Sequence, residues 1–275
     1  MPPKRNYRGE KCPKDLIEIA SFIFVCFVTI TVSSFELFMV LPTFYEPGSF
    51  WYVTHVVFGT FLLFNIIGNY ALMICVDTSV RGSLPQHSSN YRYCQKCLIY
   101  APPRSWHCEL CNTCILKRDH HCIFTGYCIG YFNYRYFAMC VVYMLIGNAY
   151  AMYFNLCYIV ANMAFSSSWA LLQFLFPLSM VYYRVGISEL QLCLFLFWGN
   201  LSSFIFMLIL LIIHVTLVYK GTTRYESRQR QYQYDLGWKQ NCVEVFGKRG
   251  LLALISPFTC SELPGNGIEW RTKET

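Results

Sequence analysis

The segment from Cys94 to Cys128 constrains the fold of this chain more than any other feature. Its thirty-five residues contain seven of the fifteen cysteines and three of the six histidines in the 275-residue sequence. Cysteine and histidine at this density, with two-residue spacings between several cysteines, are typical of metal sites in a chain without secretory signs. The segment has few large aliphatic residues and shows no repetitive pattern, so it cannot build a hydrophobic core. We therefore expect bound metal to supply its folding energy.

Ten side chains in this segment could ligate a metal ion. A structural zinc ion takes four ligands in a tetrahedron, so two zinc ions would use eight of the ten and leave two. Spacing alone does not say which two are left. The candidates are Cys94, Cys97, His107, Cys108, Cys111, Cys114, His120, His121, Cys122 and Cys128.

Long apolar runs flank the cysteine-rich segment on both sides. Hydrophobic residues make up 55% of the chain and charged residues only 13%, whereas a soluble domain is usually about a quarter charged. Runs at 16–41, 51–76, 136–165 and 190–219 are each long enough to cross a hydrocarbon core of about 30 Å. The stretch 169–183 is ambiguous between a further span and an interfacial segment. Composition and run length predict an all-α integral membrane protein.

The basic residues indicate how the spans are oriented. With four spans, 21 of the 22 lysines and arginines fall on one side of the membrane, whereas a fifth span would move the nine of the C-terminal tail to the other side. Because positive residues collect on the cytosolic side, we expect four transmembrane helices with both termini in the cytosol. The net charge is +7, and the basic residues that produce it lie beside apolar spans. This position favours the lipid bilayer rather than nucleic acid as the partner.

The expected organisation follows from these runs and charges. The predicted segments are a cytosolic basic N-terminus at 1–15, two spans within 16–76, a cytosolic zinc-binding domain at 77–135, two further spans within 136–219 with a lumenal or interfacial segment at 166–189, and a cytosolic tail at 220–275.

Asparagines recur inside the apolar runs. Asn148, Asn155 and Asn162 are seven residues apart, and Asn65 and Asn69 are four apart, so each set lies on one face of a helix. Their side chains could form hydrogen bonds between helices or line a cavity. A channel or transporter is disfavoured because no ladder of ionisable residues crosses any run.

Four consecutive residues in the cysteine-rich segment carry the parts of an activated nucleophile. They are Asp119, His120, His121 and Cys122. In such a site a histidine takes the proton of the thiol, and a carboxylate orients the histidine. The alternative is a pair of zinc knuckles that only binds partners. Spacing alone does not choose between the two hypotheses.

These residues resemble the DHHC-type protein S-acyltransferases, also called palmitoyltransferases. The family pattern is C-x2-C-x9-H-C-x2-C-x2-C-x4-D-H-H-C-x5-C-x4-N-x3-F, and the chain fits it at every place from Cys94 to Asn133 and Phe137. The four-span arrangement, with the cysteine-rich segment between the second and third spans, is similar too. The resemblance implies four transmembrane helices with a cytosolic cysteine-rich domain that binds two structural zinc ions.

The resemblance also assigns roles to the candidate residues. One zinc ion would bind Cys94, Cys97, His107 and Cys114, and the other would bind Cys108, Cys111, His121 and Cys128. This leaves Cys122 as the nucleophile, His120 as its base and Asp119 as the residue that holds the base. Arg104 is then a candidate contact for a phosphate of acyl-CoA, although it could equally be a solvated surface arginine.

The activity that the resemblance implies is transfer of a fatty acyl group, palmitoyl by expectation, from acyl-CoA to protein cysteines. The protein substrates would be membrane-associated and carry cytosolic cysteines. The implied location is a multi-pass position in the membrane of the endoplasmic reticulum or Golgi.

The chain departs from the family pattern in several places. In Thr222-Thr223-Arg224-Tyr225-Glu226, either one residue is inserted into the family's T-T-x-E, or Arg224 replaces the second threonine. Ile123-Phe124 and Gly126-Tyr127 stand where the family usually has Pro-Trp and two asparagines. These departures leave open the alternative of a catalytically weak or inactive membrane scaffold with a two-zinc partner-binding domain. Further on, Gly237-x3-Asn241-x3-Val245-Phe246-Gly247 resembles the family's C-terminal motif, and the resemblance implies that Asn241 helps to hold the tail against the spans.

Overall fold

The structure is a computed structural model that describes residues 15–80, 91–163, 167–178 and 188–273. The lysines and arginines expected in the basic N-terminus lie outside the described residues, as do residues 166 and 179–187 of the expected lumenal or interfacial segment. Within the described part of the chain, four helical stretches are long and apolar enough to cross a membrane. This agrees with the expectation of a multi-pass membrane protein.

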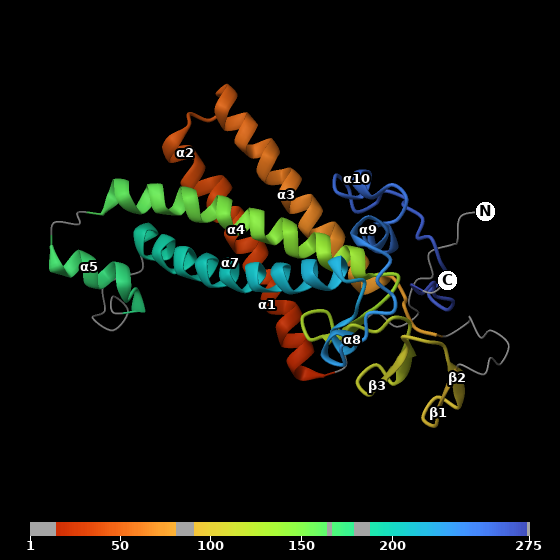
Figure 1. Cartoon of the computed structure of the whole chain (residues 1–275). Coiled ribbons are helices and arrows are strands. Elements are labelled where there is room, and N and C mark those ends of the chain that lie inside the picture. The colour runs from red at the N-terminus through yellow and green to blue at the C-terminus, as the bar shows by residue number, and fades with distance from the viewer. Residues whose placement is uncertain (1–14, 81–90, 164–166, 179–187, 274–275) are drawn as a thin grey trace. The chain divides into compact units, whose positions relative to one another are not determined.

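The four long helical stretches coincide with the apolar runs (Figure 1). The first is continuous through α1 (Leu16–Phe35), the π-helical turn η1 (Glu36–Val40) and α2 (Leu41–Phe44), and the others are α3 (Phe50–Cys75), α4 (Tyr134–Asn162) and α7 (Glu189–Tyr219). Each contains more than the roughly 20 residues that a bilayer requires. Many of their large apolar side chains are exposed, as lipid-facing residues would be.

The ambiguous stretch after the third span contains a short helix, α5 (Ser168–Leu175). Its N-terminus is capped by the side chain of Ser167, which accepts a hydrogen bond from the backbone N–H of Ala170 at 3.1 Å. Eight residues cannot cross a bilayer that needs about 20. The described part of this stretch is therefore not a further span.

The chain divides into two compact units. One consists of Met1–Val25, Asn65–Val141 and Leu211–Thr275, and the other of Cys26–Phe64 and Val142–Leu210. The second unit is purely helical in its described part and has its own hydrophobic core. Members of that core include Phe154, Tyr158, Ile159, Leu194 and Phe197.

Two of the intramembrane asparagines form hydrogen bonds between helices of the second unit. Asn148 donates to the hydroxyl of Ser203 at 2.8 Å, and Asn155 donates to the carboxylate of Glu36 at 2.6 Å. Asn162 instead donates to a carbonyl of its own helix. The interpretation as interhelical hydrogen bonds is confirmed for Asn148 and Asn155.

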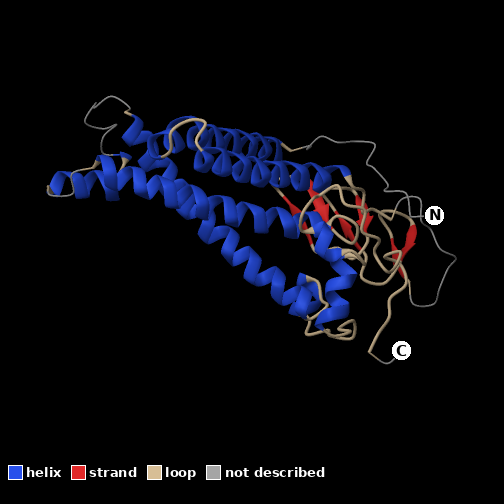
Figure 2. Cartoon of the chain, turned by 90° about the horizontal axis from the view of Figure 1, so that it is seen from above, coloured by secondary structure: helices blue, strands red, loops and turns tan. Residues whose placement is uncertain are grey.

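The expectation of an all-α fold was wrong for the cysteine-rich segment, which contains six short strands in its described part (Figure 2). They form three antiparallel hairpins: β1 (Arg92–Cys94) with β2 (Ile99–Ala101), β3 (Trp106–Cys108) with β4 (Thr113–Ile115), and β5 (His120–Cys122) with β6 (Tyr127–Ile129). Strands of three residues are too short to show apolar alternation, so no periodic signal in the sequence indicates them.

The three hairpins recur at a spacing of fourteen residues along the chain. In each hairpin the first strand ends at a cysteine, and the fourth residue after that cysteine has a positive φ: 54° at Leu98, 48° at Asn112 and 69° at Gly126. The expectation that this segment has no repetitive pattern was therefore wrong. The repeat lies in backbone conformation and in one cysteine per hairpin, while most other side chains differ.

Backbone hydrogen bonds and a buried asparagine join the hairpins to the adjacent helices. The carbonyl of Cys114 accepts from the N–H of Val80 at 2.8 Å, just after α3. Asn133, which is fully buried, accepts from the N–H of Gly130 and donates to the carbonyls of Cys128 and Met73 at 3.0 and 3.1 Å. One side chain thus ties the third hairpin to the end of α3 and the start of α4.

The described part of the C-terminal tail contains three short helices, α8 (Arg224–Arg228), α9 (Trp238–Phe246) and α10 (Gly250–Ala253). Asn241 of α9 donates to the carbonyl of Tyr219, the last residue of α7, at 2.9 Å. Its side-chain oxygen accepts from the N–H of Leu236. The tail is therefore held to the fourth span by Asn241, as the resemblance implied.

Candidate active site and metal sites

Two groups of four cysteine and histidine side chains come together in the hairpins. Across paired strands, His107 lies opposite Cys114, and His121 lies opposite Cys128. Each of these pairs is completed by two cysteines of the preceding hairpin, one at the end of its first strand and one in its turn. The resulting groups are Cys94, Cys97, His107 and Cys114, and Cys108, Cys111, His121 and Cys128, whose ligand atoms lie within 4.8 Å of one another. They are the two groups that the resemblance implied.

The spacing of the donor atoms suits zinc. Nδ1 of His107 is 3.8 and 3.2 Å from Sγ of Cys94 and Cys97. Nδ1 of His121 is 3.5, 3.4 and 3.7 Å from Sγ of Cys108, Cys111 and Cys128. A tetrahedral zinc ion with bonds of about 2.0–2.3 Å places its ligand atoms roughly 3.5–3.8 Å apart. Three thiolates and one imidazole are also a preferred donor set for a structural zinc site.

The pleat of β5 separates metal ligation from the remaining reactive groups. Successive side chains of a strand point to opposite faces. His121 faces the second metal group, so its neighbours His120 and Cys122 share the opposite face of the strand. His120 and Cys122, the two of the ten candidate ligands that belong to neither metal group, therefore lie side by side on one face of β5.

The third hairpin lacks the second cysteine that the first two hairpins have. Cys122 is in the position of Cys94 and Cys108, but Thr125 stands where the others have Cys97 and Cys111. Thr125 is fully buried. Its hydroxyl hydrogen bonds to the Cys122 side chain. A hairpin with one thiol offers half of a zinc knuckle, and this explains why Cys122 stays outside both metal groups.

Asp119, His120 and Cys122 form a hydrogen-bonded series. Nδ1 of His120 lies 2.7 Å from Oδ2 of Asp119, and the His120 side chain is also hydrogen bonded to Cys122. A carboxylate only accepts, so Nδ1 carries the proton and Nε2 faces the thiol. The side chain of Asp119 is only 1% exposed. This is the arrangement of an oriented base and a nucleophile.

Burial and hydrogen bonding act in opposite directions on these three groups. Burial disfavours the thiolate of Cys122, but the hydrogen bond and charge of His120 outweigh it, so the pKa of Cys122 is lowered. Burial likewise opposes charge on His120 and Asp119, yet their mutual hydrogen bond raises the pKa of His120 and lowers the pKa of Asp119. The site therefore favours a thiolate beside an imidazolium.

Arg224, just after the fourth span, contacts Asp119, and His214, near the end of that span, contacts Arg224 in turn. The backbone N–H of Arg224 donates to Oδ1 of Asp119 at 3.0 Å, and Nε of Arg224 lies 3.5 Å from Oδ2. Nη2 of Arg224 donates to Nε2 of His214 at 2.8 Å. His214 must then carry its proton on Nδ1, which lies 2.6 Å from the hydroxyl of Tyr134.

The same arrangement resolves the ambiguous motif after the fourth span. Thr223 caps α8 and forms a capping box with Glu226, so Arg224 takes the place of the second threonine of T-T-x-E. Asp119, His120 and His214 also lie within 4.8 Å of one another, but the guanidinium of Arg224 beside them disfavours a metal cation. His214 and Arg224 were not predicted from the sequence. Their signals were the lone histidine of an apolar run and the departure from the family motif.

Arg104 is buried rather than solvated, with 8% of its surface exposed. It forms a bidentate ion pair with Glu226, at 2.7 Å from Nε and 2.6 Å from Nη2. Its guanidinium also lies 4.3 Å from the ring centre of Tyr234 and 4.5 Å from that of Trp270. The interpretation as a solvated surface arginine was therefore wrong, and its contact with acyl-CoA stays a prediction.

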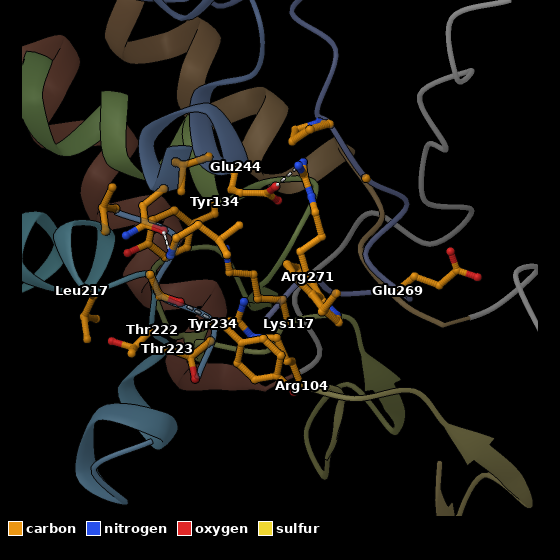
Figure 3. Close-up of a pocket in the computed structure, with 18 of the residues that line it drawn as sticks. Arg104, Lys117, Tyr134, Leu217, Thr222, Thr223, Tyr234, Glu244, Glu269 and Arg271 are labelled. Atoms are coloured by element: carbon orange, nitrogen blue, oxygen red, sulfur yellow. Dashed lines mark hydrogen bonds and ion pairs between the residues drawn. The ribbon is translucent and has the colours of Figure 1, made fainter. Parts of the chain in front are cut away.

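Arg104 also lines a pocket of about 600 Å³ between the cysteine-rich domain, the end of α7 and the tail (Figure 3). In the close-up, Arg104, Lys117 and Tyr234 lie near one another, and an ion pair of 3.7 Å joins Glu244 to Arg271. Burial, followed by the charge of Arg104, lowers the pKa of Lys117 to about 7. The lining also contains the carboxyl groups of Glu244 and Glu269. Its cationic and aromatic side chains suit an anionic ligand with an aromatic ring.

The fold and the site define a class: a multi-span membrane protein with two zinc-type clusters and a buried Asp-His-Cys series. The model of the DHHC palmitoyltransferase family matches residues 87–231, and the chain belongs to this family. It is 33% identical over 227 residues to the probable palmitoyltransferase ZDHHC24 of Homo sapiens, an alignment that covers 78% of this chain and 77% of that protein.

Two other relatives extend this comparison. The palmitoyltransferase ZDHHC22 of Mus musculus is 29% identical over 259 residues, which cover 87% of this chain and 91% of that protein. The probable protein S-acyltransferase 13 of Arabidopsis thaliana is 30% identical over 202 residues, which cover 70% of this chain and 59% of that protein. These similarities extend through the spans as well as the cysteine-rich segment.

Proposed function

We propose that this chain transfers a fatty acyl group from acyl-CoA to cysteine thiols of membrane-associated proteins through an acyl-enzyme on Cys122. The observation that carries the proposal is the series Asp119–His120–Cys122. It is buried, it has the hydrogen bonds of a nucleophile with an oriented base, and it lies on the strand face opposite the metal group. Family membership supports protein S-acyltransferase activity in general.

The first half-reaction transfers the acyl group to the enzyme. The thiolate of Cys122 attacks the thioester carbonyl, while its proton resides on Nε2 of His120. The carbon–sulfur bond to CoA breaks, and the departing CoA thiolate takes the proton from His120. Asp119 holds Nδ1–H of His120 throughout and stabilises the imidazolium. The products are free CoA and a thioester on Cys122.

The second half-reaction transfers the acyl group to the protein substrate. His120, now neutral, accepts the proton of an incoming cysteine thiol, whose sulfur attacks the acyl thioester. Cys122 leaves as a thiolate and the enzyme returns to its starting state. This two-step exchange is ping-pong covalent catalysis.

The two Cys3His groups are proposed to hold zinc ions that act structurally. Zinc there supplies folding free energy, on the order of 10 kcal/mol per site in zinc peptides. The chain's own residues do the rest: the hairpins place β5, and the pleat keeps His120 and Cys122 away from the metal. His121 is not the base in this proposal because its Nδ1 faces three cysteine sulfurs.

The pocket beside Arg104 and Lys117 is proposed to receive the CoA head group. Trp270 and Tyr234 offer aromatic faces, and Lys117 offers a cation for a phosphate. Arg271 lines the pocket too, but it is paired with Glu244 at 3.7 Å. The guanidinium of Arg104 is already paired with the carboxylate of Glu226. We therefore infer that Arg104 shapes the pocket wall and adds positive electrostatic potential, while Lys117 contacts a phosphate of CoA directly. Tyr134, which bonds His214, lines the same pocket and connects it to the site of Asp119.

A membrane position suits this reaction for a physical reason. Burial of an acyl chain in hydrocarbon is worth about 0.8 kcal/mol per CH2, so spans beside the nucleophile keep the chain of the acyl-enzyme out of water. We infer that the cysteine-rich domain and both termini face the cytosol, from the distribution of lysine and arginine. For location we propose the endoplasmic reticulum or Golgi, on family membership alone.

The test uses a clickable palmitate analogue in cells or a palmitoyl-CoA analogue with purified protein. Wild type should acquire label that hydroxylamine removes, and Cys122→Ser should acquire none. Cys260→Ser is the matched control, since Cys260 is an exposed cysteine outside the hairpins, and it should be labelled like wild type. A membrane scaffold without activity predicts no label on wild type. Equal labelling of Cys122→Ser would overturn the assignment of the nucleophile.

A further inference from the structure

Glu18, in the first turn of α1, lies against a zinc-type ligand of the cysteine-rich domain. Its Oε1 is 2.7 Å from Nε2 of His121, although the two residues are 103 positions apart in the sequence. Both side chains are buried, with 6% and 8% of their surfaces exposed. We propose that Glu18 is a positioning residue: it fixes the metal-ligating form of His121 and ties the first span to the second metal site.

The tautomer of His121 follows from its two sets of neighbours. Nδ1 lies 3.4–3.7 Å from the sulfurs of Cys108, Cys111 and Cys128, so the lone pair of Nδ1 is the one available to a metal. Nε2 then carries the proton and donates it to Glu18. A carboxylate in this position holds the ring orientation and raises the basicity of the ligating nitrogen.

The surroundings of Glu18 accommodate its charge. Three thiolates and a divalent ion leave the second metal group with a net negative charge, and a carboxylate adds to it. Arg118 offsets this by hydrogen bonding to the sulfurs of Cys128 and Cys108. Glu18 also lies in the first turn of a twenty-residue helix, where the helix dipole favours an anion.

Within the described part of the chain, the other metal group lacks an equivalent carboxylate. Nε2 of its histidine, His107, lies 3.8 Å from Oε2 of Glu109, beyond hydrogen-bond distance. Glu109 is 70% exposed and is paired with Lys96. The second group therefore depends on a buried carboxylate from a membrane span, whereas the first does not.

The contact has a consequence for the reaction, and this step relies on the proposed function. His121 stands between His120 and Cys122 in β5. A ring held by metal on one nitrogen and by Glu18 on the other cannot rotate, so the strand that presents the base and the nucleophile is fixed to α1. Loss of Glu18 should therefore loosen both zinc retention and nucleophile placement.

The experiment compares zinc release from purified full-length protein to a chromogenic chelator, with zinc content measured by mass spectrometry. Glu18→Leu fills a similar volume without an acceptor and should release one of the two zinc ions about 10- to 100-fold faster than wild type. Glu18→Gln keeps an acceptor oxygen and should stay within about threefold of wild type. Glu109→Gln is the matched control and should not change either ion's release rate.

The same Glu18→Leu substitution in a second variant, His121→Cys, distinguishes the positioning role of Glu18 from a general loss of folding. His121→Cys offers zinc four thiolates, a donor set that also binds structural zinc, and it leaves Glu18 no ring to hold. In that background, adding Glu18→Leu should not speed zinc release. Faster release in both backgrounds, or no faster release in the wild-type background, would overturn the role of Glu18.

The proposed function can fail separately from this inference. Wild-type protein that carries fewer than two zinc ions would overturn the zinc assignment and the role of Glu18 with it. Wild type that carries two zinc ions, loses one faster in Glu18→Leu and yet acquires no acyl label would support the role of Glu18 while overturning the transferase.

Discussion

Arg224 holds Asp119 with its backbone and its side chain at once: the N–H of Arg224 donates to Oδ1 at 3.0 Å, and Nε lies 3.5 Å from Oδ2. The two residues are 105 positions apart. The backbone contact does not depend on the residue type, because every residue except proline offers an N–H. This explains how the site can accept arginine where the family motif has threonine.

Substitution of Arg224 by alanine should reduce the turnover of acyl-CoA moderately and should not abolish it. The N–H contact survives, whereas the substitution removes the partly exposed ion pair of 3.5 Å and the hydrogen bond to Nε2 of His214. We expect a loss of about 1 kcal/mol, or about fivefold in kcat. Arg228→Ala changes an exposed arginine of the same helix and should have no effect. A loss above about a hundredfold would mean that Arg224 acts directly in the reaction.

Replacement of Thr125 by cysteine should bind Cys122, the proposed nucleophile, in a metal site or a disulfide. The substitution restores, in the third hairpin, the Cys-x-x-Cys turn that the first two hairpins offer to metal. In Thr125→Cys, the thiol of Cys122 should bind added zinc or become oxidised to a disulfide with the new thiol, and acylation should fall by at least about tenfold. Reductant and a mild chelator should restore it. Thr125→Ser keeps the hydroxyl and should stay active. Acylation of Thr125→Cys at the wild-type level would contradict the interpretation that Cys122 escapes metal binding because its hairpin has only one cysteine.

Binding of CoA should weaken as the pH rises through about 7, the pKa of Lys117. Lys117 carries its charge below this pH and loses it above, so its attraction for a phosphate is present at about pH 6 and largely absent at about pH 8. Calorimetry of CoA binding to Cys122→Ala measures this without turnover. Lys117→Arg should bind with little pH dependence, since arginine stays charged. An affinity that stays constant across this pH range with Lys117 in place would contradict the proposed contact.

The same lowered pKa affects stability with a definite sign. Between about 7 and the ordinary lysine value, the unfolded chain binds a proton that folded Lys117 does not, so the contribution of Lys117 to the free energy of unfolding rises with pH. Lys117→Met should remove this contribution, and denaturation at several pH values in this range measures it. Burial is the largest cause of the lowered pKa of Lys117, and the positive charge of Arg104 is the second. The negative charges of Glu244, Glu226 and Asp119 raise the pKa of Lys117 in opposition.

Disruption of the ion pair between Arg104 and Glu226 should destabilise the folded protein strongly. Both side chains are buried, with 3% and 4% of their surfaces exposed, and removal of one partner leaves an uncompensated charge that costs about 3–5 kcal/mol. Arg104→Met and Glu226→Met should each lower the unfolding temperature in detergent. The double variant should lose less than the two single losses combined.

The exposed pair of Lys96 and Glu109 is the control for this double-mutant cycle. Its side chains are 58% and 70% exposed, and such pairs contribute about 0–1 kcal/mol. Glu109→Gln should leave the unfolding temperature nearly unchanged. Additive losses in Arg104→Met and Glu226→Met would show that the two side chains act independently.

Much of the architecture follows from local sequence. The apolar runs predict four spans because crossing a bilayer requires about 20 apolar residues in one helix. The spacing of cysteine and histidine predicts metal binding because the ligands of each knuckle are close in sequence. The family motif adds the Asp119, His120 and Cys122 series. These features depend on neighbours within a few residues, so they can be recognised directly in the sequence.

The hairpins were missed because their strands are too short for a period-two pattern to show. Once they form, the pleat alone decides that His121 faces the metal group while His120 and Cys122 share the other face. The burial of Arg104 was missed for a different reason. Its partners Glu226, Tyr234 and Trp270 follow the fourth span, more than a hundred residues later.

The sequence by itself predicted the candidate membrane spans, the types of metal ligand and the candidate reactive residues. Only the tertiary structure decided that Glu18 reaches His121, that Arg224 contacts both Asp119 and His214, and that Lys117 lines a pocket. A span is stable because its own apolar side chains transfer from water into lipid, and the hydrophobicity of that stretch of sequence indicates this directly. Contacts between distant segments depend on how helices and hairpins pack, and no periodicity along the chain encodes which side chains then meet.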